Sequence, residues 1–448
     1  MLEKFSNKVA KKDNFSNQME FRKKSNVKLP THVKKNRIRK TCMPEVTIKD
    51  VKTLDGRTTT LNLEGPVART IECEGKLTAL PALIDPHVHF RTPGQEYKED
   101  FGTGAQAAIA GGVTTVFDMP NNEPPMVTML RMDEKVKRID QQLKRVDIPL
   151  RYGLFFGADG KNIGEIQKVK NKIIGIKVFM AGSTGHLYVD DDKALERIFQ
   201  LAAQENILVA VHAESQKIIN ENQANYKSSD VRSHSLIRSR EAAIKATEKA
   251  LHLAQEYNTE VYFCHVSTKE ELELLKDAKQ DQMLVYIEVT PQHLFFTDKD
   301  YDSLGSKIQM NPPIRTQEDH NALWLAINDD WIDVIGTDHA PHTLQEKAKP
   351  YPESPSGVPG VETRLPLLLN AYSQGRISLN KIVELTRSNI DSIFNLGHQE
   401  DLVLVDLNLK KEVRDQDQKT KCGWSPYSGR VLQGWPTHTI LKGRVYDL

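Results

Sequence analysis

The stretch Leu83-Ile-Asp-Pro-His87-Val-His89-Phe-Arg91 decides how the rest of the chain is interpreted. It is a short apolar run that contains two histidines separated by one residue. Side chains along a β-strand alternate between two sides, so His87 and His89 point to the same side and both imidazoles can reach one ion. The stretch therefore predicts a buried strand with metal ligands at its downstream end.

Seven further apolar runs follow, and four of them end in a polar group that could bind metal: Lys177, His212, His265 and Asp338. The runs are 114–121, 150–158, 173–180, 207–214, 260–266, 283–291 and 334–341. Connections such as 195–202 place apolar residues at helical spacing. Repeated strand–helix units with chemistry at the strands' C-terminal ends predict an α/β fold, a (β/α)8 TIM-like barrel.

Composition is that of a globular protein. A chain of 448 residues, 39% hydrophobic and 27% charged, suits a barrel of about 250 to 400 residues with a small satellite. The net charge of +1 indicates no nucleic-acid partner for the folded part. The sequence contains no run that could span a bilayer and no apolar signal segment, which argues against membrane insertion and secretion. Four scattered cysteines, Cys42, Cys73, Cys264 and Cys422, favour reduced thiols in the cytoplasm.

Charge and periodicity divide the chain into three parts. Residues 1–43 lack hydrophobic periodicity, and residues 1–42 carry thirteen Lys or Arg and a net charge of +10, against −9 for the remainder. We interpret 1–43 as a disordered basic extension, with a nucleic-acid arm or an organelle transit segment as alternatives. Short alternating bursts in 44–80 and 396–448 predict antiparallel strands that together form a small β-sandwich beside a catalytic barrel at 81–395.

Each ligand candidate has a plain structural alternative. A lone His-x-His pair arises by chance in many chains with 14 histidines, and His212 or His265 alone could be a hydrogen-bonded core histidine. Lys177 is harder to explain, because it sits in the apolar run 173–180, where an unpaired ammonium is costly. Asp338 follows the mostly apolar residues 334–337, where an unpaired carboxylate is equally costly. Since one barrel brings all strand ends to a common centre, these residues together predict a metal site.

The residue types at this centre predict a hydrolytic zinc site. Imidazoles and carboxylates without thiolates suit Zn²⁺. Two neighbouring ions need an anionic group between them, and carbamylation of Lys177 by CO2 would convert a buried cation into such a bridge. Two metals would acidify a bridging water until it becomes a nucleophile near neutral pH. Asp338 could take the proton of this nucleophile and return it to a leaving nitrogen, which makes it the candidate catalytic residue.

As a set, the motifs resemble the dihydroorotase branch of the metal-dependent amidohydrolase superfamily over about residues 45–445. The matching segments are Asp85-Pro-His-Val-His-Phe-Arg-Thr-Pro-Gly94, Lys98-Glu-Asp-Phe101, Met119-Pro-Asn-Asn-Glu-Pro-Pro125, Val211-His-Ala-Glu214, Cys264-His-Val266, Asn311-Pro-Pro-Ile-Arg315, Thr337-Asp-His-Ala-Pro-His342 and Gly357-Val-Pro-Gly-Val-Glu-Thr363. The chain is similar both to stand-alone bacterial enzymes of the long type and to the corresponding domain of the animal trifunctional pyrimidine-synthesis protein.

The resemblance implies two zinc ions per subunit. The implied ligands are His87, His89 and Asp338 for the first ion, His212 and His265 for the second, and Lys177, as a carboxylated lysine, for both. The implied activity is the reversible zinc-dependent cyclisation of N-carbamoyl-L-aspartate to L-dihydroorotate in de novo pyrimidine (UMP) biosynthesis.

The ring carboxylate of dihydroorotate calls for a fixed cation beside the metals. Arg91 closely follows the histidine pair, so it can point into the same mouth and offer a bidentate guanidinium; a surface arginine at the barrel rim is the alternative. In the family, Asn121 and His342 complete the carboxylate site, and Asn311 and the backbone near Gly357 hold the ring amide edges. Hydantoinases and dihydropyrimidinases take neutral rings and lack this arginine, and allantoinases also differ there.

Two features extend the site beyond these motifs. The segment 181–186 follows Lys177, and its two glycines and two hydroxyls suit a lid over the substrate, with Ser183 and Thr184 as contacts; an ordinary connecting loop is the alternative. Cys264 and Glu288 match positions that can hold a third zinc in the animal domain, against the alternative of a buried structural cysteine.

Three questions about function stay open at this stage. The resemblance favours a homodimer and leaves an association with aspartate transcarbamoylase as a further possibility. Another cyclic amidase, such as a dihydropyrimidinase, is the alternative enzyme, and Arg91 argues against it. A barrel that has lost catalysis and serves as an oligomerisation scaffold is the alternative of a different class, but all six metal-ligand positions are present.

Overall fold

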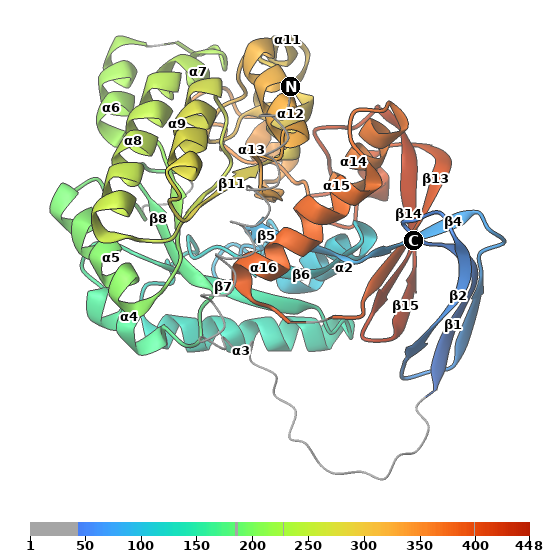
Figure 1. Cartoon of the computed structure of the whole chain (residues 1–448). Coiled ribbons are helices and arrows are strands. Elements are labelled where there is room, and N and C mark those ends of the chain that lie inside the picture. Colours follow the sequence, from blue (N-terminus) through green and yellow to red (C-terminus); the bar gives the residue numbers. More distant parts are fainter. Residues whose placement is uncertain (1–43, 184–186, 227, 398) are drawn as a thin grey trace, which may run out of the picture.

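The computed structural model describes residues 44–183, 187–226, 228–397 and 399–448, which form two β-sheets and a shell of helices (Figure 1). The extension predicted at residues 1–43 lies outside these ranges. Among the described helices, none combines the length and the apolar character needed to cross a bilayer.

The larger sheet has eight parallel strands that lie side by side in sequence order. They are β5 (Leu83–Val88), β6 (Val113–Asp118), β7 (Arg151–Gly157), β8 (Gly175–Phe179), β9 (Val209–His212), β10 (Val261–Phe263), β11 (Val285–Val289) and β12 (Val334–Ile335). A parallel bridge between Val88 and His339 joins the end of β5 to the segment after β12 and so connects the two edges of the sheet. The TIM-like barrel predicted from the sequence is confirmed.

Helices follow each strand and lie around the barrel, and the last of them, α16, packs against its interior (Figure 1). They are α2 (Phe101–Ala110), α3 (Met129–Val146), α4 (Ile163–Val169), α5 (Asp192–Glu205), α6 (Gln216–Asn225), α7 (Ser233–Ile237), α8 (Arg240–Tyr257), α9 (Lys269–Gln280), α10 (Pro291–Phe295), α11 (Tyr301–Leu304), α12 (Gln317–Asn328), α13 (Leu344–Lys347), α14 (Arg364–Ser373), α15 (Leu379–Val383) and α16 (Asn389–Phe394). Local sequence sets their starts. At α9, for example, Thr268 and Glu271 form a reciprocal capping box that satisfies backbone N–H groups of the first turn.

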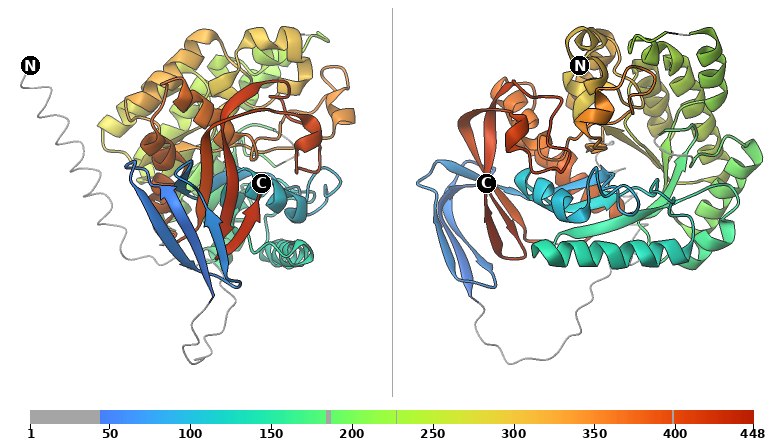
Figure 2. Two further views of the ribbon diagram at one scale, coloured as in Figure 1. Left: turned by 90° about the vertical axis from the view of Figure 1, so that its right-hand side faces the viewer. Right: turned by 180° about the vertical axis from the view of Figure 1, so that it is seen from behind.

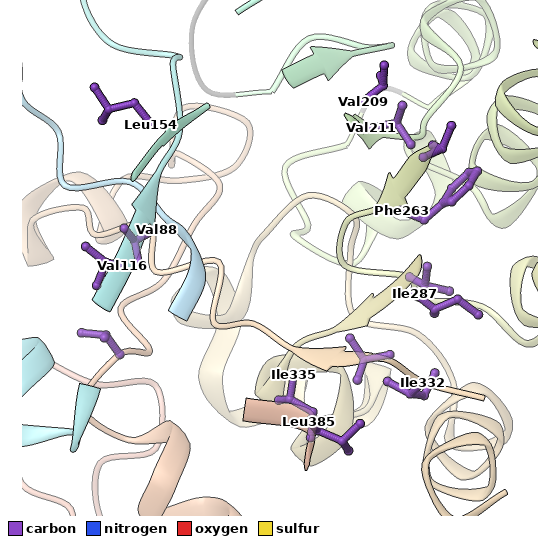
Figure 3. Close-up of a cluster of buried hydrophobic side chains, with 14 of the residues drawn as sticks. Val88, Val116, Leu154, Val209, Val211, Phe263, Ile287, Ile332, Ile335 and Leu385 are labelled. Atoms are coloured by element: carbon purple, nitrogen blue, oxygen red, sulfur yellow. The ribbon is translucent and has the colours of Figure 1, made fainter. Parts of the chain in front are cut away.

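Alternation along the strands separates the barrel side chains into two layers. The outward layer packs against the helices in the main core and includes Val88, Val116, Leu154, Val209, Val211, Phe263 and Ile287 (Figure 3). The inward layer is a separate cluster, in which Phe394 of α16 lies 4.8 Å from the ring of Phe117 and 6.0 Å from that of Phe155. The interior is therefore filled by side chains, and inward positions near the strands' C-terminal ends are left for polar groups.

Both chain ends contribute to the second sheet, which has seven strands. They are β1 (Glu45–Lys52), β2 (Thr58–Glu64), β3 (Arg69–Glu72), β4 (Leu77–Pro81), β13 (Leu402–Glu412), β14 (Val431–Leu441) and β15 (Arg444–Asp447). Pairing of β4 with β13 joins the N-terminal to the C-terminal segment. Figure 2 shows β13 and β14 between the barrel and the outer strands β1 and β2. The small β-unit made from both ends is confirmed as one hydrogen-bonded sheet, and the domain boundaries given above stay a prediction.

A buried clamp holds the first and last barrel strands together. Asp85 accepts hydrogen bonds from the backbone N and the Oγ1 of Thr337, at 3.1 and 2.6 Å. Arg364 donates to the backbone oxygens of Ile84 and Ile335, at 2.9 and 2.8 Å. The two charged side chains are 3.7 Å apart and 0% exposed. The clamp thus joins β5 to β12 at the point where the predicted metal-binding segments begin.

Replacing Arg364 by Met should lower the free energy of unfolding by about 3 to 5 kcal/mol, because it leaves the Asp85 carboxylate buried without a cation. Urea unfolding followed by tryptophan fluorescence measures the change. Arg138→Met is the matched control, since it removes an exposed ion pair with Glu96 and should cost less than about 1 kcal/mol. Equal effects of the two substitutions would contradict the clamp.

Candidate metal centre and substrate pocket

The ends of the barrel strands bring five of the predicted ligands to one cavity. His87, His89, His212, His265 and Asp338 all line it. Ring centroids are 5.4 Å apart for His87 and His89, 5.5 Å for His87 and His265, and 4.8 Å for His212 and His265. None of the four imidazoles is more than 8% exposed. These residues therefore surround one common cavity at the barrel mouth, as the sequence predicted.

In the neutral state, His87 and His89 direct ring lone pairs towards Asp338. Their Nδ1 atoms lie 2.8 Å from Glu288 Oε1 and 2.7 Å from Asn121 Oδ1, so each Nδ1 carries the hydrogen and donates it. Their Nε2 atoms lie 3.3 and 3.0 Å from Asp338 Oδ1. Two lone pairs and a carboxylate that converge with no hydrogen between them fit a bound cation such as Zn²⁺.

The charges around this group also favour a cation. Burial lowers the pKa of His87, but the carboxylates of Glu288 and Asp338 outweigh burial and raise it well above the ordinary value. Burial lowers the pKa of His89 to about 4. Burial raises the pKa of Asp338, but the charge of His87 and the hydrogen bond with His89 outweigh it, so the pKa ends below its usual range. The site therefore calls for one positive charge, which a metal ion can supply in place of a proton.

His212 and His265 form the second ligand pair. His212 Nε2 lies 2.9 Å from Glu214 Oε2, so this nitrogen carries the hydrogen and Nδ1 keeps its lone pair. That Nδ1 lies 3.0 Å from His265 Nε2. Burial lowers the pKa of both imidazoles, that of His265 furthest. Among the described residues, His265 Nδ1 is buried without a hydrogen-bond partner. With its hydrogen on Nδ1, His265 would offer a second lone pair to a cation.

Lys177 lies behind the cavity wall on β8 and is fully buried. Its Nζ donates to Cys264 Sγ at 2.9 Å and lies 4.9 Å from the centroid of the Phe179 ring. In the described part of the chain, no carboxylate lies within ion-pair distance of this ammonium. An unpaired buried ammonium is costly, so these surroundings fit conversion to a carbamate, which stays a prediction.

Three site residues have a left-handed backbone conformation that the sequence pattern did not predict. Arg91, His265 and Asp338 have φ values of 57°, 38° and 45°. Each comes two or three residues after a barrel strand ends. Such conformations cost non-glycine residues about 1 to 3 kcal/mol and persist only where surrounding contacts enforce them. Here they turn the chain sharply at the barrel mouth and bring these side chains into the cavity wall.

Arg91 provides a buried positive charge in the cavity wall. Its Nε donates to the backbone oxygen of Pro341 at 3.1 Å, and its Nη2 lies 3.2 Å from His342 Nε2. No carboxylate of the described residues is within ion-pair distance of its guanidinium. Burial lowers the pKa of Arg91 to about 10, which leaves it charged at neutral pH. A buried cation without an anionic partner fits an anionic group on the ligand.

His342 lies behind Arg91 and is not part of the cavity lining. Lys98 Nζ lies 3.1 Å from His342 Nδ1 and can only donate, so Nδ1 accepts and Nε2 carries the hydrogen. That Nε2 faces the backbone oxygen of Ser356 at 3.1 Å. Burial and the charge of Arg91 lower the pKa of His342 well below its ordinary value. His342 is therefore a neutral neighbour of Arg91 whose Nε2–H donates to Ser356 and does not accept from the guanidinium, and its predicted contact with the substrate stays a prediction.

The other predicted substrate contacts lie around the cavity. Its lining includes Asn121, Ser183, Asn311 and Gly357. Gly357 has a φ of 132°, and a Cβ there would come within 2.6 Å of the backbone oxygen of Ala340, which explains the need for glycine. Asn311 Nδ2 donates to Ser183 Oγ at 3.3 Å. Thr184, the second predicted lid contact, lies outside the described residues, and the lid stays a prediction.

Arg238 is a supporting residue that no sequence pattern pointed to, because it follows α7 and not a barrel strand. Its Nε and Nη2 donate to Glu214 Oε2 at 2.9 and 2.6 Å, and the same oxygen contacts His212. Its Nη1 donates to the backbone oxygen of Gly182 at 2.9 Å. Arg238 thus links a metal-ligand candidate to the loop after β8.

Glu288, the candidate for a third zinc, is held by several donors. It accepts hydrogen bonds from His87 Nδ1 at 2.8 Å, from the backbone N of His265 at 2.9 Å and from Tyr262 OH at 2.7 Å. Its carboxylate also forms a compact group with Cys264 and His87, with potential ligand atoms within 4.8 Å of one another. These contacts orient His87 as expected of a carboxylate behind a metal-bound histidine. The third zinc stays a prediction.

Comparison with known proteins agrees with this geometry. A profile described as the amidohydrolase family matches residues 78–446. The chain belongs to the amidohydrolase family. A dihydroorotase of Halobacterium salinarum is 36% identical over 415 residues, which cover 88% of this chain and 95% of that protein. A region of the multifunctional protein CAD of Squalus acanthias is 36% identical over 372 residues, 83% of this chain but 15% of that protein.

Solved structures of the family share the fold. The L-hydantoinase (dihydropyrimidinase) from Arthrobacter aurescens superimposes with a TM-score of 0.84 at 27% sequence identity, over 90% of this chain and 96% of that chain. The resemblance inferred from the motifs is thus confirmed at the level of family and fold.

Replacing Lys177 by Ala should abolish hydrolysis and lower the zinc that co-purifies, because it removes the predicted bridge between two ligand groups. Short carboxylic acids such as acetate should restore part of the hydrolytic activity and part of the bound zinc. Zinc is measured by elemental analysis of the purified protein. The control is Lys172→Ala, which removes an exposed lysine paired with Asp133 and should change neither. Full activity with full zinc in Lys177→Ala would contradict the two-metal arrangement.

Proposed function

We propose that this amidohydrolase is a dihydroorotase, which catalyses the reversible, zinc-dependent cyclisation of N-carbamoyl-L-aspartate to L-dihydroorotate in de novo pyrimidine biosynthesis. Relatives that carry this name and match over most of their length support the proposal. So does the cavity, whose lining combines His87, His89 and Asp338 with the pair His212 and His265 and with the buried cation of Arg91.

The charge of Arg91 is the observation that carries the substrate assignment. A neutral hydantoin or dihydropyrimidine ring offers no anion to a buried guanidinium, and leaving that guanidinium unpaired beside such a ring would be costly. The ring carboxylate of dihydroorotate can accept two parallel hydrogen bonds from it. The fold alone does not make this distinction, since hydantoinases share it.

The residues suit a hydrolytic metal centre. His87, His89 and Asp338 would hold one zinc ion, His212 and His265 the other, and carboxylated Lys177 would bridge them. Bound zinc would supply an acidified water and polarise the amide carbonyl. Asp338 is ionised and at the cavity surface, so it can accept a proton from the attacking water and donate it to the leaving ring nitrogen.

Substrate contacts around the metals determine which bond is cleaved. With the ring carboxylate fixed by Arg91, the amide on the opposite side of the ring is directed to the zinc ligands. Asn311, the backbone at Gly357 and the lid residue Ser183 would hold the remaining ring edge and limit access of bulk water. Asn121 would complete the carboxylate site while its Oδ1 orients His89.

A cytoplasmic location, a homodimer and an association with aspartate transcarbamoylase are further parts of the proposal. Free cysteines at positions 73, 264 and 422 support a reducing compartment. A similar region inside a protein named multifunctional supports association with other enzymes. The homodimer follows from the resemblance of the motifs alone.

Arg91→Met should cut kcat/KM for dihydroorotate by roughly 30- to several-thousand-fold, because a buried charge-assisted contact is lost. Zinc content should stay near that of the wild type, since Arg91 is not a ligand. Dihydrouracil, a neutral ring, serves as the matched control substrate, and any turnover of it should change far less. Equal losses on the two rings would remove the support for dihydroorotate and leave a general cyclic amidase.

A further inference from the structure

His234, on the short helix α7, lies at the edge of the cavity but outside both metal-ligand groups. Its ring is 7% exposed and packs edge-on against Tyr351, with centroids 5.7 Å apart. Burial, helped by the charge of Arg238, lowers the pKa of His234 to about 4. The imidazole is therefore neutral near pH 7 and carries a single N–H.

The contacts of His234 show which nitrogen carries this hydrogen. Nε2 lies 3.1 Å from the backbone oxygen of Met310, 2.8 Å from Asn311 Oδ1 and 3.3 Å from Ser356 Oγ. A backbone oxygen can only accept, so Nε2 is the donor. If the Asn311 carboxamide were reversed, its NH2 group would face the Nε2–H at the same 2.8 Å, and two donors would oppose each other. The histidine therefore selects the orientation in which Asn311 Oδ1 accepts.

The opposite edge of the Asn311 carboxamide is consequently an N–H donor. Its Nδ2 lies 3.3 Å from Ser183 Oγ, and both residues line the cavity. We infer that His234 is a positioning residue that holds Asn311 so that Nδ2 donates a hydrogen bond to an oxygen of the substrate. An asparagine in the reverse orientation would instead accept from a ring N–H.

This role rests on the proposed function and makes its substrate contact more specific. The carbonyl of the scissile amide belongs at the zinc ligands, so the acceptor that remains for Asn311 is the oxygen of the ureido carbonyl. That carbonyl is present in dihydroorotate and in N-carbamoyl-L-aspartate, and also in neutral rings such as dihydrouracil and hydantoin. His234 should therefore affect charged and neutral rings alike, in contrast to Arg91.

The test compares zinc-loaded, full-length variants in steady-state kinetics with dihydroorotate. His234→Phe keeps an aromatic ring but removes the N–H, and should raise KM roughly 5- to 100-fold, as expected for one hydrogen bond. The rate constant kcat should change less than about threefold, because the contact lies away from the scissile bond. His234→Gln places a carboxamide N–H near the lost Nε2–H and should recover most of the affinity. If His234 had only a structural role, KM would not change more than kcat, and His234→Gln would not recover the affinity.

Asn311→Asp tests the direction of the carboxamide itself. The aspartate still accepts from His234 but turns a second oxygen to the substrate, so it should weaken binding at least as much as Asn311→Ala. Wild-type KM in Asn311→Asp would overturn the inference, because it would mean that the oxygen faces the substrate. Asn311→Asp also tests the inferred orientation of the carboxamide if His234→Phe does not fold. The exposed-histidine control, His252→Gln on α8, should change nothing.

Two other outcomes separate this inference from the proposed function. An unchanged KM in His234→Phe with wild-type zinc content and melting temperature overturns the inference and leaves the dihydroorotase assignment intact. Failure of the wild type to turn over dihydroorotate overturns the assignment instead. The same variants are then compared on dihydrouracil and hydantoin, whose ureido oxygen can accept the same hydrogen bond from Asn311.

Discussion

The buried clamp between β5 and β12 is the interaction on which the rest of the structure depends. Asp85, Thr337 and Arg364 join the two edges of the parallel sheet, next to the backbone bridge between Val88 and His339. His87 and Asp338 follow the clamped segments directly, one on each side of the seam. Their contact at 3.3 Å therefore exists because the barrel closes there. Closure of the barrel between β5 and β12 therefore both stabilises the fold and brings the ligands of the first ion together.

Much of the fold and the identity of the ligand candidates could be predicted from local patterns. Short apolar runs identified the barrel strands, and the spacing of His87 and His89 placed both on one side of a strand. Arg238 and His234 were not predicted, because they act from the connection around α7 through contacts with residues far away in sequence. The left-handed backbone at Asp338 is likewise enforced by tertiary contacts and has no local signature.

The fold is similar to that of hydantoinases, whereas the sequence is similar to that of dihydroorotases. The charge of Arg91 distinguishes between these two activities. Hydantoinases share the fold with a TM-score as high as 0.84, while relatives matched by sequence over most of their length are named dihydroorotases. A barrel scaffold supports both chemistries, so the fold carries no preference. The buried guanidinium of Arg91, with neutral His342 behind it, is a feature that favours a ring carrying a carboxylate.

The central claim is that the barrel mouth holds two zinc ions bridged by a modified Lys177, with Arg91 facing the substrate carboxylate. A crystal of the zinc-loaded protein with L-dihydroorotate, measured at the zinc absorption edge, tests it most directly. The account predicts two anomalous peaks, one beside His87 and His89 and one beside His212 and His265, with carbamate density on Nζ and the carboxylate on Arg91. A single peak, or an unmodified lysine with the ring carboxylate elsewhere, would contradict it.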